Sequence, residues 1–222
     1  MQEIYFDEIL STQDYAKKLI LEGKEDFVVF ANTQTNGRGR FSRCWEAPSG
    51  GLWFSFDNDF YENNGLFTIT VGVIVREILE KSCKCGLKLK WPNDIILDNK
   101  KVCGIICEKV NNKVIIGIGI NTNVKKINEE KAISFFEKIG ISINNYELMK
   151  EIIEESKREL KLKTNNIIER FRENMAFCGE ECFISSLNKN AKVLDIKEDG
   201  RLIVKTDKGI EEVFTGEINE CI

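Results

Sequence analysis

The sequence predicts an α+β protein, with a larger domain at residues 1–177 and a small β module at residues 178–222. Its 222 residues fit one large domain with an appendage, because folding units typically contain about 100–200 residues. Strand-like apolar runs and helical spacings are interleaved up to residue 175. From residue 178 the pattern changes to short strand-like runs broken by turn signals such as Asp199-Gly200, which is typical of a small barrel.

Individual elements follow from local patterns. Ser11 precedes a helical pattern and Asp14 stands three residues later, so the pair predicts a capping box at the start of a helix. Within the segment 66–79, apolar residues recur at helical spacing on nearly all sides, which predicts a core helix. The polar, glycine-rich segment 32–48 has no apolar periodicity and is expected to be a loop. The remaining patterns predict strands at 4–6, 27–30, 52–56, 87–90, 95–97, 102–108 and 114–120, and helices at 133–139, 149–162 and on to 175.

The composition excludes several kinds of chemistry. The chain has no histidine, which excludes Ser-His-Asp and Cys-His catalysis, zinc sites with histidine ligands and histidine general bases. The net charge is −4, which argues against broad electrostatic attraction to nucleic acid or to anionic membranes. No apolar run approaches the roughly 20 residues that span a bilayer, so no membrane partner is expected.

The eight cysteines are predicted to be reduced thiols. Their C-x-C and C-x3-C spacings do not match the paired C-x2-C pattern of a structural zinc site. The first ten residues lack a basic region followed by an apolar stretch, so a secretory signal is not expected. Reduced thiols are typical of cytoplasmic proteins, and the cytoplasm is the location that we expect.

The segment after Gln34 is rich in arginine and glycine. Arg38, Arg40 and Arg43 lie within six positions, and Trp45 ends the run. Glycines allow backbone N–H groups to approach an anion, and arginines bind carboxylate or phosphate through paired hydrogen bonds. The indole offers a flat surface to a purine or another ring. The pattern favours an anion-binding segment at residues 37–45, here called the arginine loop, over the alternative of a solvated basic loop.

Two further motifs carry polar residues next to predicted strands. In Lys90-Trp-Pro-Asn-Asp94 the proline interrupts strand pairing, so Asn93 and Asp94 are expected at a fixed turn. The alternative is a plain turn in which the tryptophan belongs to the core. Lys101 follows a turn and precedes Gly104, a strand glycine that indicates a bulge or a close backbone approach. Taken alone, such a lysine is more often solvated than directed into a pocket.

The run from Val114 to Asn123 has one apolar face and one bare face. Read with a period of two, Val114, Ile116, Ile118 and Ile120 share a face, whereas Gly117, Gly119 and Asn121 lie on the other. A strand stripped to its backbone on one side is expected beneath a flat ligand. It is not a dinucleotide fingerprint, because the glycines lie inside the strand. Together, the four motifs describe a cradle for an anionic ligand that carries a ring.

Taken in order, these motifs resemble the catalytic region of biotin protein ligases. They read Gly-Arg-Gly-Arg-x-x-Arg-x-Trp, Lys-Trp-Pro-Asn-Asp, Lys-x-x-Gly-Ile and Gly-x-Gly-Ile-Asn, and the similarity extends to Gly216-Glu-Ile218 near the end. The resemblance implies an α+β catalytic domain of the class II aminoacyl-tRNA synthetase and biotin synthetase type, a mixed β-sheet with helices, followed by an SH3-like β-barrel. It also implies an ATP-dependent ligase that forms biotinyl-5'-AMP and transfers biotin to a lysine of a biotin carboxyl carrier protein.

The resemblance assigns roles to individual residues. Lys101, Arg40 and Asp94 would be catalytic: Lys101 would bridge the biotin carboxylate and the α-phosphate, and Asp94 would accept a proton from the attacking lysine. The residues implied for biotin binding are Ser11, Thr12, Gln13, Gln34, Gly37, Arg38, Gly39, Arg40, Lys101, Gly104 and Gly117. Those implied for ATP and the adenylate are Arg40, Arg43, Trp45, Asn93 and Asn121.

The same resemblance implies the cofactors and partners. ATP would bring Mg²⁺ with it, without side-chain ligands for the metal, and the acceptor would be the carrier domain of acetyl-CoA carboxylase or a related carboxylase. Relatives that repress transcription carry an N-terminal DNA-binding domain, whereas the first predicted strand here begins almost at Met1, so neither DNA binding nor repression is expected. Relatives occur as monomers or homodimers. Phe41 and Ser42 replace the Arg and Gly that relatives often carry. A non-catalytic biotin-responsive protein and a lipoate-type ligase remain alternatives.

Overall fold

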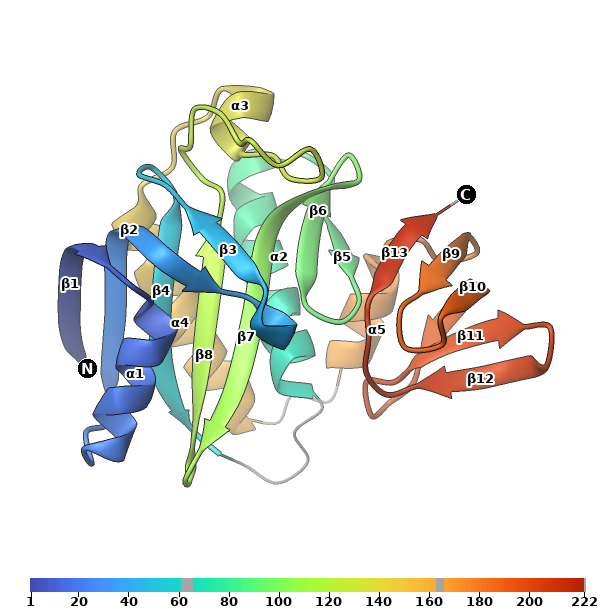
Figure 1. Ribbon diagram of the computed structural model, residues 1–222, viewed down its shortest axis with the longest axis horizontal. Coiled ribbons are helices and arrows are strands. Elements are labelled where there is room, and N and C mark those ends of the chain that lie inside the picture. Colours follow the sequence, from blue (N-terminus) through green and yellow to red (C-terminus); the bar gives the residue numbers. More distant parts are fainter. Residues whose placement is uncertain (61–65, 163–165, 222) are drawn as a thin grey trace.

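The computed structural model describes residues 1–60, 66–162 and 166–221, which form two β-sheets (Figure 1). The larger sheet has the strand order β1-β2-β4-β8-β7-β6-β5, with β3 paired to β2. β1 and β2 run parallel and the other pairs run antiparallel, so the sheet is mixed, as expected. Its strands are β1 (Gln2–Ile9), β2 (Phe27–Arg38), β3 (Cys44–Ala47), β4 (Leu52–Asp59), β5 (Lys88–Lys90), β6 (Asp94–Leu97), β7 (Lys100–Val110) and β8 (Lys113–Ile120).

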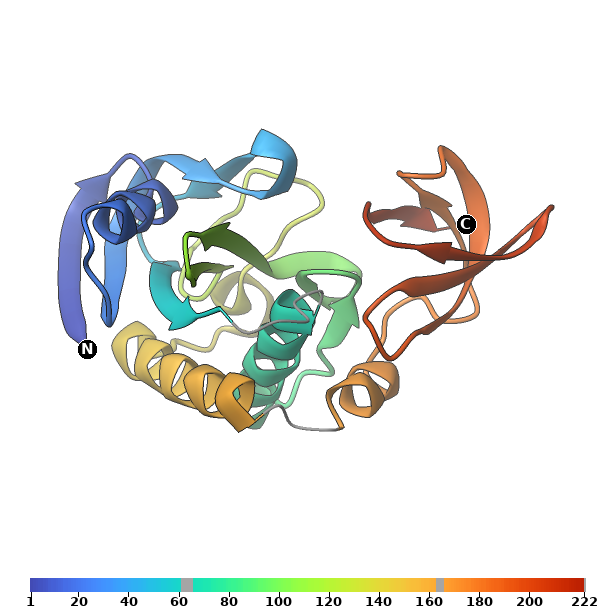
Figure 2. The same ribbon diagram turned by 90° about the horizontal axis from the view of Figure 1, so that it is seen from below.

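Helices cover both faces of this sheet (Figure 2). α1 (Thr12–Leu21) lies on one face, and α2 (Phe67–Cys83) and α4 (Asn145–Leu162) lie on the other. The main hydrophobic core packs against α2 and α4, and a smaller cluster packs beneath α1. The expected core helix is confirmed, because α2 buries residues on nearly every side. Two short helices, α3 (Phe135–Ile139) and α5 (Ile167–Glu173), complete the helices of the described ranges.

The second sheet is antiparallel and follows α5 in the chain (Figure 1). Arg172 of α5 donates to Asp195 Oδ1 at 2.8 Å and to the Ile196 carbonyl at 2.6 Å, so the helix is fastened to the sheet. The expectation of short strands after residue 178 is confirmed, whereas a domain boundary between residues 177 and 178 remains our proposal. The strands are β9 (Glu181–Ile184), β10 (Lys189–Ile196), β11 (Leu202–Thr206), β12 (Gly209–Val213) and β13 (Ile218–Cys221).

The start of α1 agrees with its predicted cap in one of two respects. The Ser11 hydroxyl accepts a hydrogen bond from the Asp14 backbone N–H at 3.3 Å, which satisfies one of the free donors at the helix start. The Asp14 carboxylate does not complete the box, because it forms an ion pair with Arg38. Helix capping therefore leaves the acidic side chain free to hold the arginine loop.

The expected loop at 32–48 is wrong for most of its length. β2 continues to Arg38 and pairs with β3, with Gln34 opposite Ala47 and Gly37 opposite Trp45. A short 3-10 turn at Arg40–Ser42 joins the two strands. Apolar alternation is absent because this hairpin projects beyond the core, and its backbone hydrogen bonds need no apolar side chains. The hairpin is what presents the arginines at defined positions.

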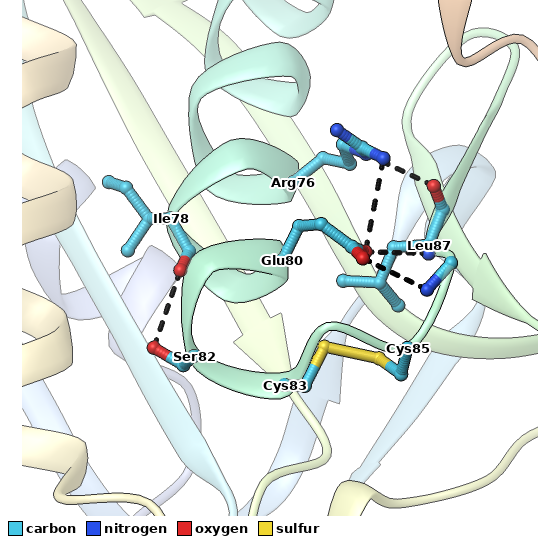
Figure 3. Close-up of a disulfide and its surroundings, with 8 residues drawn as sticks. Arg76, Ile78, Glu80, Ser82, Cys83, Cys85 and Leu87 are labelled. Atoms are coloured by element: carbon cyan, nitrogen blue, oxygen red, sulfur yellow. Dashed lines mark hydrogen bonds and ion pairs between the residues drawn. A yellow bond between two sulfur atoms is a disulfide. The ribbon is translucent and has the colours of Figure 1, made fainter.

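The prediction that every cysteine is a free thiol is also wrong. Cys83 is bonded to Cys85 at the end of α2 (Figure 3), and Cys182 of β9 is bonded to Cys221 of β13. The intervening Lys84 adopts a left-handed conformation with φ 48°, which returns the chain so that the two C-x-C sulfur atoms meet. Cys182 and Cys221 are direct partners in the register of their strands. Neither the left-handed turn at Lys84 nor the register of β9 and β13 can be predicted from cysteine spacing.

Labelling with iodoacetamide is expected to modify Cys44 and Cys178 well before Cys103. The first two thiols are exposed and the third is buried. Burial raises the pKa of the Cys103 thiol above its usual value, so little reactive thiolate forms near neutral pH. Peptide mass spectrometry after timed labelling without reductant measures the order. Labelling of Cys103 at the rate of Cys178 in folded protein would contradict this placement.

The described helices include none that is both long enough and apolar enough to cross a membrane.

Candidate active site

Three glycines leave space on one face of β7 and β8. A Cβ atom on Gly117 would lie 2.4 Å from Gln13 Oε1, and one on Gly119 would lie 2.8 Å from the Trp45 ring. A Cβ on Gly104 would lie 2.9 Å from both Trp45 Cζ3 and Lys101 Cε. The bare face predicted for β8 is therefore confirmed. The flat group that covers Gly119 is the indole of Trp45 itself, which comes from the neighbouring hairpin.

Hydroxyl and amide groups from three elements form one wall beside the glycines. Gln34 Oε1 accepts from the Thr12 backbone N–H at 2.8 Å and from the Thr12 hydroxyl at 3.1 Å. The Thr12 hydroxyl lies 2.9 Å from the Ser55 hydroxyl, which donates to Gln13 Oε1 at 3.0 Å. Ser11, Thr12, Gln13 and Ser55 are all buried. This wall is polar, ordered by internal hydrogen bonds and largely shielded from bulk water.

Lys101 and the neighbouring polar residues form a second wall. The Lys101 Nζ lies 2.8 Å from Asp94 Oδ1 and 4.9 Å from the centre of the Trp45 ring. The Lys101 carbonyl accepts from the Ile133 N–H at 3.0 Å and from Asn121 Nδ2 at 3.4 Å. These backbone contacts hold the start of β7, so the ammonium is directed to the pocket rather than to bulk water.

The arginine loop reaches across to the second sheet. Arg40 Nη1 donates to Asn93 Oδ1 and to the Gly216 carbonyl, both at 3.1 Å. Arg43 forms an ion pair with Glu217, so two loop arginines contact the segment that leads into β13. Burial lowers the pKa of the Arg40 guanidinium, and the carboxylates of Glu217 and Asp94 oppose that change. Arg40 still carries its charge, because a guanidinium does not deprotonate in proteins.

Nearly all of the predicted site residues line one pocket of about 170 Å³. In the described part of the chain, Gly37 and Asp94 are the predicted residues that do not line it. Gly37 pairs with Trp45 in the β2–β3 hairpin, where a Cβ would lie 2.5 Å from the Trp45 carbonyl oxygen. Asp94 forms an ion pair with the pocket residue Lys101. The predicted residues that do line the pocket are Ser11, Thr12, Gln13, Gln34, Arg38, Gly39, Arg40, Arg43, Trp45, Asn93, Lys101, Gly104, Gly117 and Asn121.

Sequence reasoning missed several polar residues at the site. Ser55 and Glu217 line the pocket, and Glu108 holds two of its residues from behind, accepting from Gln13 at 2.8 Å and from Arg38 at 2.9 Å. Ser55 had a usable signal, because it is a lone hydroxyl in the otherwise apolar run 52–56. Glu217 belongs to the Gly216-Glu-Ile218 motif, which was noted without a role for the glutamate, whereas Glu108 had no signal because it is one acidic residue among many.

Comparison with known families explains this arrangement. Residues 5–124 match the biotin/lipoate A/B protein ligase family, and residues 177–219 match the biotin protein ligase C-terminal domain. The chain belongs to the biotin/lipoate A/B protein ligase family. The motif resemblance is thereby confirmed, and the second sheet coincides with the region matched by the family's C-terminal domain.

Individual members of the ligase family are similar over different shares of the chain. The bifunctional ligase/repressor BirA of Bacillus subtilis is 30% identical over 97% of this chain and 73% of its own length. A biotin–(acetyl-CoA-carboxylase) ligase of Paracoccus denitrificans is 30% identical over 42% of this chain and 43% of its own. A structure of the Aquifex aeolicus biotin protein ligase in complex with biotin and ATP has a TM-score of 0.88 and 31% identity, covering 98% of this chain and 97% of that one.

Proposed function

We propose that this chain is an ATP-dependent ligase that activates biotin as biotinyl-5'-AMP and transfers it to a lysine of a biotin carboxyl carrier protein. The acceptor would belong to acetyl-CoA carboxylase or a related carboxylase. The observation that supports this best is the convergence of Lys101 and the arginine loop on one pocket whose other wall carries hydroxyl and amide groups. We also propose a cytoplasmic location, because the first step consumes ATP.

Charge repulsion is the obstacle in the first step. The biotin carboxylate is ionised near neutral pH and attacks the α-phosphorus of ATP, forming a carboxylate–phosphorus bond as pyrophosphate leaves. Two unit charges about 4 Å apart repel by about 1 kcal/mol in water and about 4 kcal/mol at an effective dielectric constant of 20. Lys101 and Arg40 would offset this repulsion and stabilise the developing charge. No proton is removed in this step, so the absence of histidine is no obstacle.

Trp45 supports a nucleotide on the arginine side of the pocket. Its Nε1 is buried and has no hydrogen-bond partner among the described residues. Buried donors are nearly always paired, so an unpaired one beside Lys101 and Gly119 fits a ligand acceptor. We propose that the indole packs against the adenylate and that Arg43, Asn93 and Asn121 lie along the same side. Ser11, Thr12, Gln13 and Gln34 would then face biotin.

The second step is an aminolysis. The carrier lysine has an ordinary pKa of about 10.4, so its ammonium must lose a proton before nitrogen attacks the biotinyl carbonyl and AMP leaves. We propose Asp94 as the proton acceptor. Its carboxylate lies 2.8 Å from Lys101 Nζ, so a proton arriving there would also weaken that ion pair and release Lys101 toward the departing phosphate.

Mg²⁺ fits this site as a companion of the nucleotide. Magnesium prefers carboxylate and phosphate oxygens and usually binds through one or two carboxylates together with substrate phosphates. Among the described residues, no cluster of three metal-binding side chains lies in the pocket. We therefore propose that the ion is held chiefly by the ATP phosphates, where it would neutralise part of their charge.

Mass spectrometry of a carrier domain tests the proposed function directly. The protein is mixed with biotin, MgATP and a purified biotin carboxyl carrier domain, and the carrier is then weighed. A gain of one biotinyl group on the acceptor lysine is expected, and a carrier with that lysine changed to alanine should gain nothing. Binding of biotin without transfer would indicate a biotin-responsive binding protein instead. Transfer of lipoate but not biotin would indicate a lipoate-type ligase.

A further inference from the structure

Glu108 lies outside the pocket but is joined to it by a buried chain of hydrogen bonds. Its Oε2 accepts from Gln13 Nε2 at 2.8 Å. Gln13 Oε1 accepts from the Ser55 hydroxyl at 3.0 Å, and Ser55 lies 2.9 Å from the Thr12 hydroxyl. Exposure is 3% or less for Gln13, Ser55 and Thr12. The chain therefore runs from β7 through the start of α1 to a pocket wall, with little access for water.

The carboxylate determines the direction of the bonds from Gln13 and Ser55. An ionised carboxylate only accepts hydrogen bonds, so the amide of Gln13 must turn its NH₂ toward Glu108 and its oxygen toward Ser55. Ser55 then uses its single hydrogen on that oxygen. Because Ser55 has no hydrogen left, the Thr12 hydroxyl shares its single hydrogen between two acceptors inside the wall, Ser55 Oγ at 2.9 Å and Gln34 Oε1 at 3.1 Å. Thr12 therefore presents only lone pairs to the pocket.

Gln34 has the opposite polarity. Its Oε1 is held by the Thr12 backbone N–H at 2.8 Å, and a backbone N–H is always a donor, so the remaining polar face of Gln34 is its NH₂ group. The wall thus offers an acceptor at Thr12 next to a donor at Gln34. A cyclic urea, with two N–H donors beside a carbonyl acceptor, is complementary to that order.

We propose that Glu108 is a positioning residue that sets the donor and acceptor order of the biotin pocket through Gln13, Ser55 and Thr12. This inference rests on the proposed function and adds a specificity determinant to it. Arg38 supports the arrangement, because its Nη2 donates to the other oxygen of Glu108 at 2.9 Å and its Nη1 pairs with Asp14. The same carboxylate thereby holds the base of the arginine loop.

Exchange of glutamate and glutamine tests the proposal without changing side-chain volume. In Glu108→Gln, the new amide oxygen stays with Arg38 and its NH₂ faces Gln13, so Gln13 flips. Ser55 then donates to Thr12, which takes one Thr12 lone pair away from the pocket. In Gln13→Glu, two carboxylates face each other. In the double variant, the glutamate at 13 accepts from both the glutamine at 108 and Ser55, which restores the original order. Each single variant is expected to weaken biotin binding about tenfold, and the double variant to recover most of it.

Titration calorimetry with biotin alone gives the affinities, and steady-state assays give KM for biotin and for ATP. KM for biotin should rise in the single variants while KM for ATP stays constant. The exposed Glu8→Gln is the matched control, and thermal unfolding checks that all variants fold. Wild-type affinity in Glu108→Gln, or a double variant as weak as the singles, would overturn the role of Glu108. A wild-type protein that binds no biotin would instead overturn the proposed function, and this inference with it.

Discussion

Replacing Lys101 with alanine is expected to slow biotinyl-adenylate formation at least about tenfold, equivalent to roughly 1.4 kcal/mol or more of lost transition-state stabilisation. The ammonium is the charged group that a biotin carboxylate and an α-phosphate would share, and its stem is fixed by backbone contacts at the start of β7. Pyrophosphate release in the presence of biotin and MgATP measures this step without the carrier. Arg40→Ala should act in the same direction.

The neighbouring Lys100 provides the matched control for Lys101. It is exposed at the first position of β7, so Lys100→Ala removes the same charge from the strand and should leave pyrophosphate release unchanged. Lys101→Ala also leaves Asp94 without its ion-pair partner, and thermal unfolding measures that separate effect on stability. Unchanged pyrophosphate release in folded Lys101→Ala would reject its assigned role.

Gly117→Ala is expected to weaken biotin binding more than about tenfold, or roughly 1.4 kcal/mol, with little change in KM for ATP. The added methyl group would lie 2.4 Å from Gln13 Oε1 and 2.8 Å from Ile106 Cγ2. Gln13 must then move, which breaks its bonds to Ser55 and Glu108 and also narrows the pocket. Calorimetry with biotin, alongside KM values for both substrates, measures the effect.

Gly72→Ala is the control for adding a methyl group to a buried glycine. Its Cβ would lie 3.7 Å from Ile105 Cδ1 and from Leu89 Cδ2, which is ordinary van der Waals contact. This position is inside α2, where alanine is favoured over glycine by about 1 kcal/mol, so the variant should be active and at least as stable. Normal biotin affinity in Gly117→Ala would mean that Gln13 does not form a wall of the biotin site.

Periodic elements were predictable because each follows from a local pattern. The strands around β4, β7 and β8 and the helices α1, α2 and α4 appear where apolar spacing placed them. The β2–β3 hairpin was not predicted, because its pairing depends on backbone hydrogen bonds between residues such as Gln34 and Ala47 and not on apolar alternation. Site residues that belong to short motifs were found for a similar reason: their spacing along one strand or turn carries the information.

The contacts between distant segments were not predictable. Glu108 meets Gln13 across 95 positions of sequence, and Arg40 meets the Gly216 carbonyl across 176. The disulfide between Cys182 and Cys221 depends on the register of two strands 39 residues apart. Such contacts depend on strand order and on the angle at which a helix enters a sheet, and neither is encoded in the spacing of a single segment.

By itself, the sequence determined the elements, the absence of histidine chemistry and the motifs that identify the family, because these depend on residue type and on spacing within one segment. Only the tertiary structure decided which groups face one another. The direction of the hydrogen bonds from Glu108 to Thr12, the position of Trp45 over Gly119 and the contacts of the arginine loop with Gly216 and Glu217 all arise when separate strands and helices pack together, since packing alone brings their donors and acceptors within bonding distance.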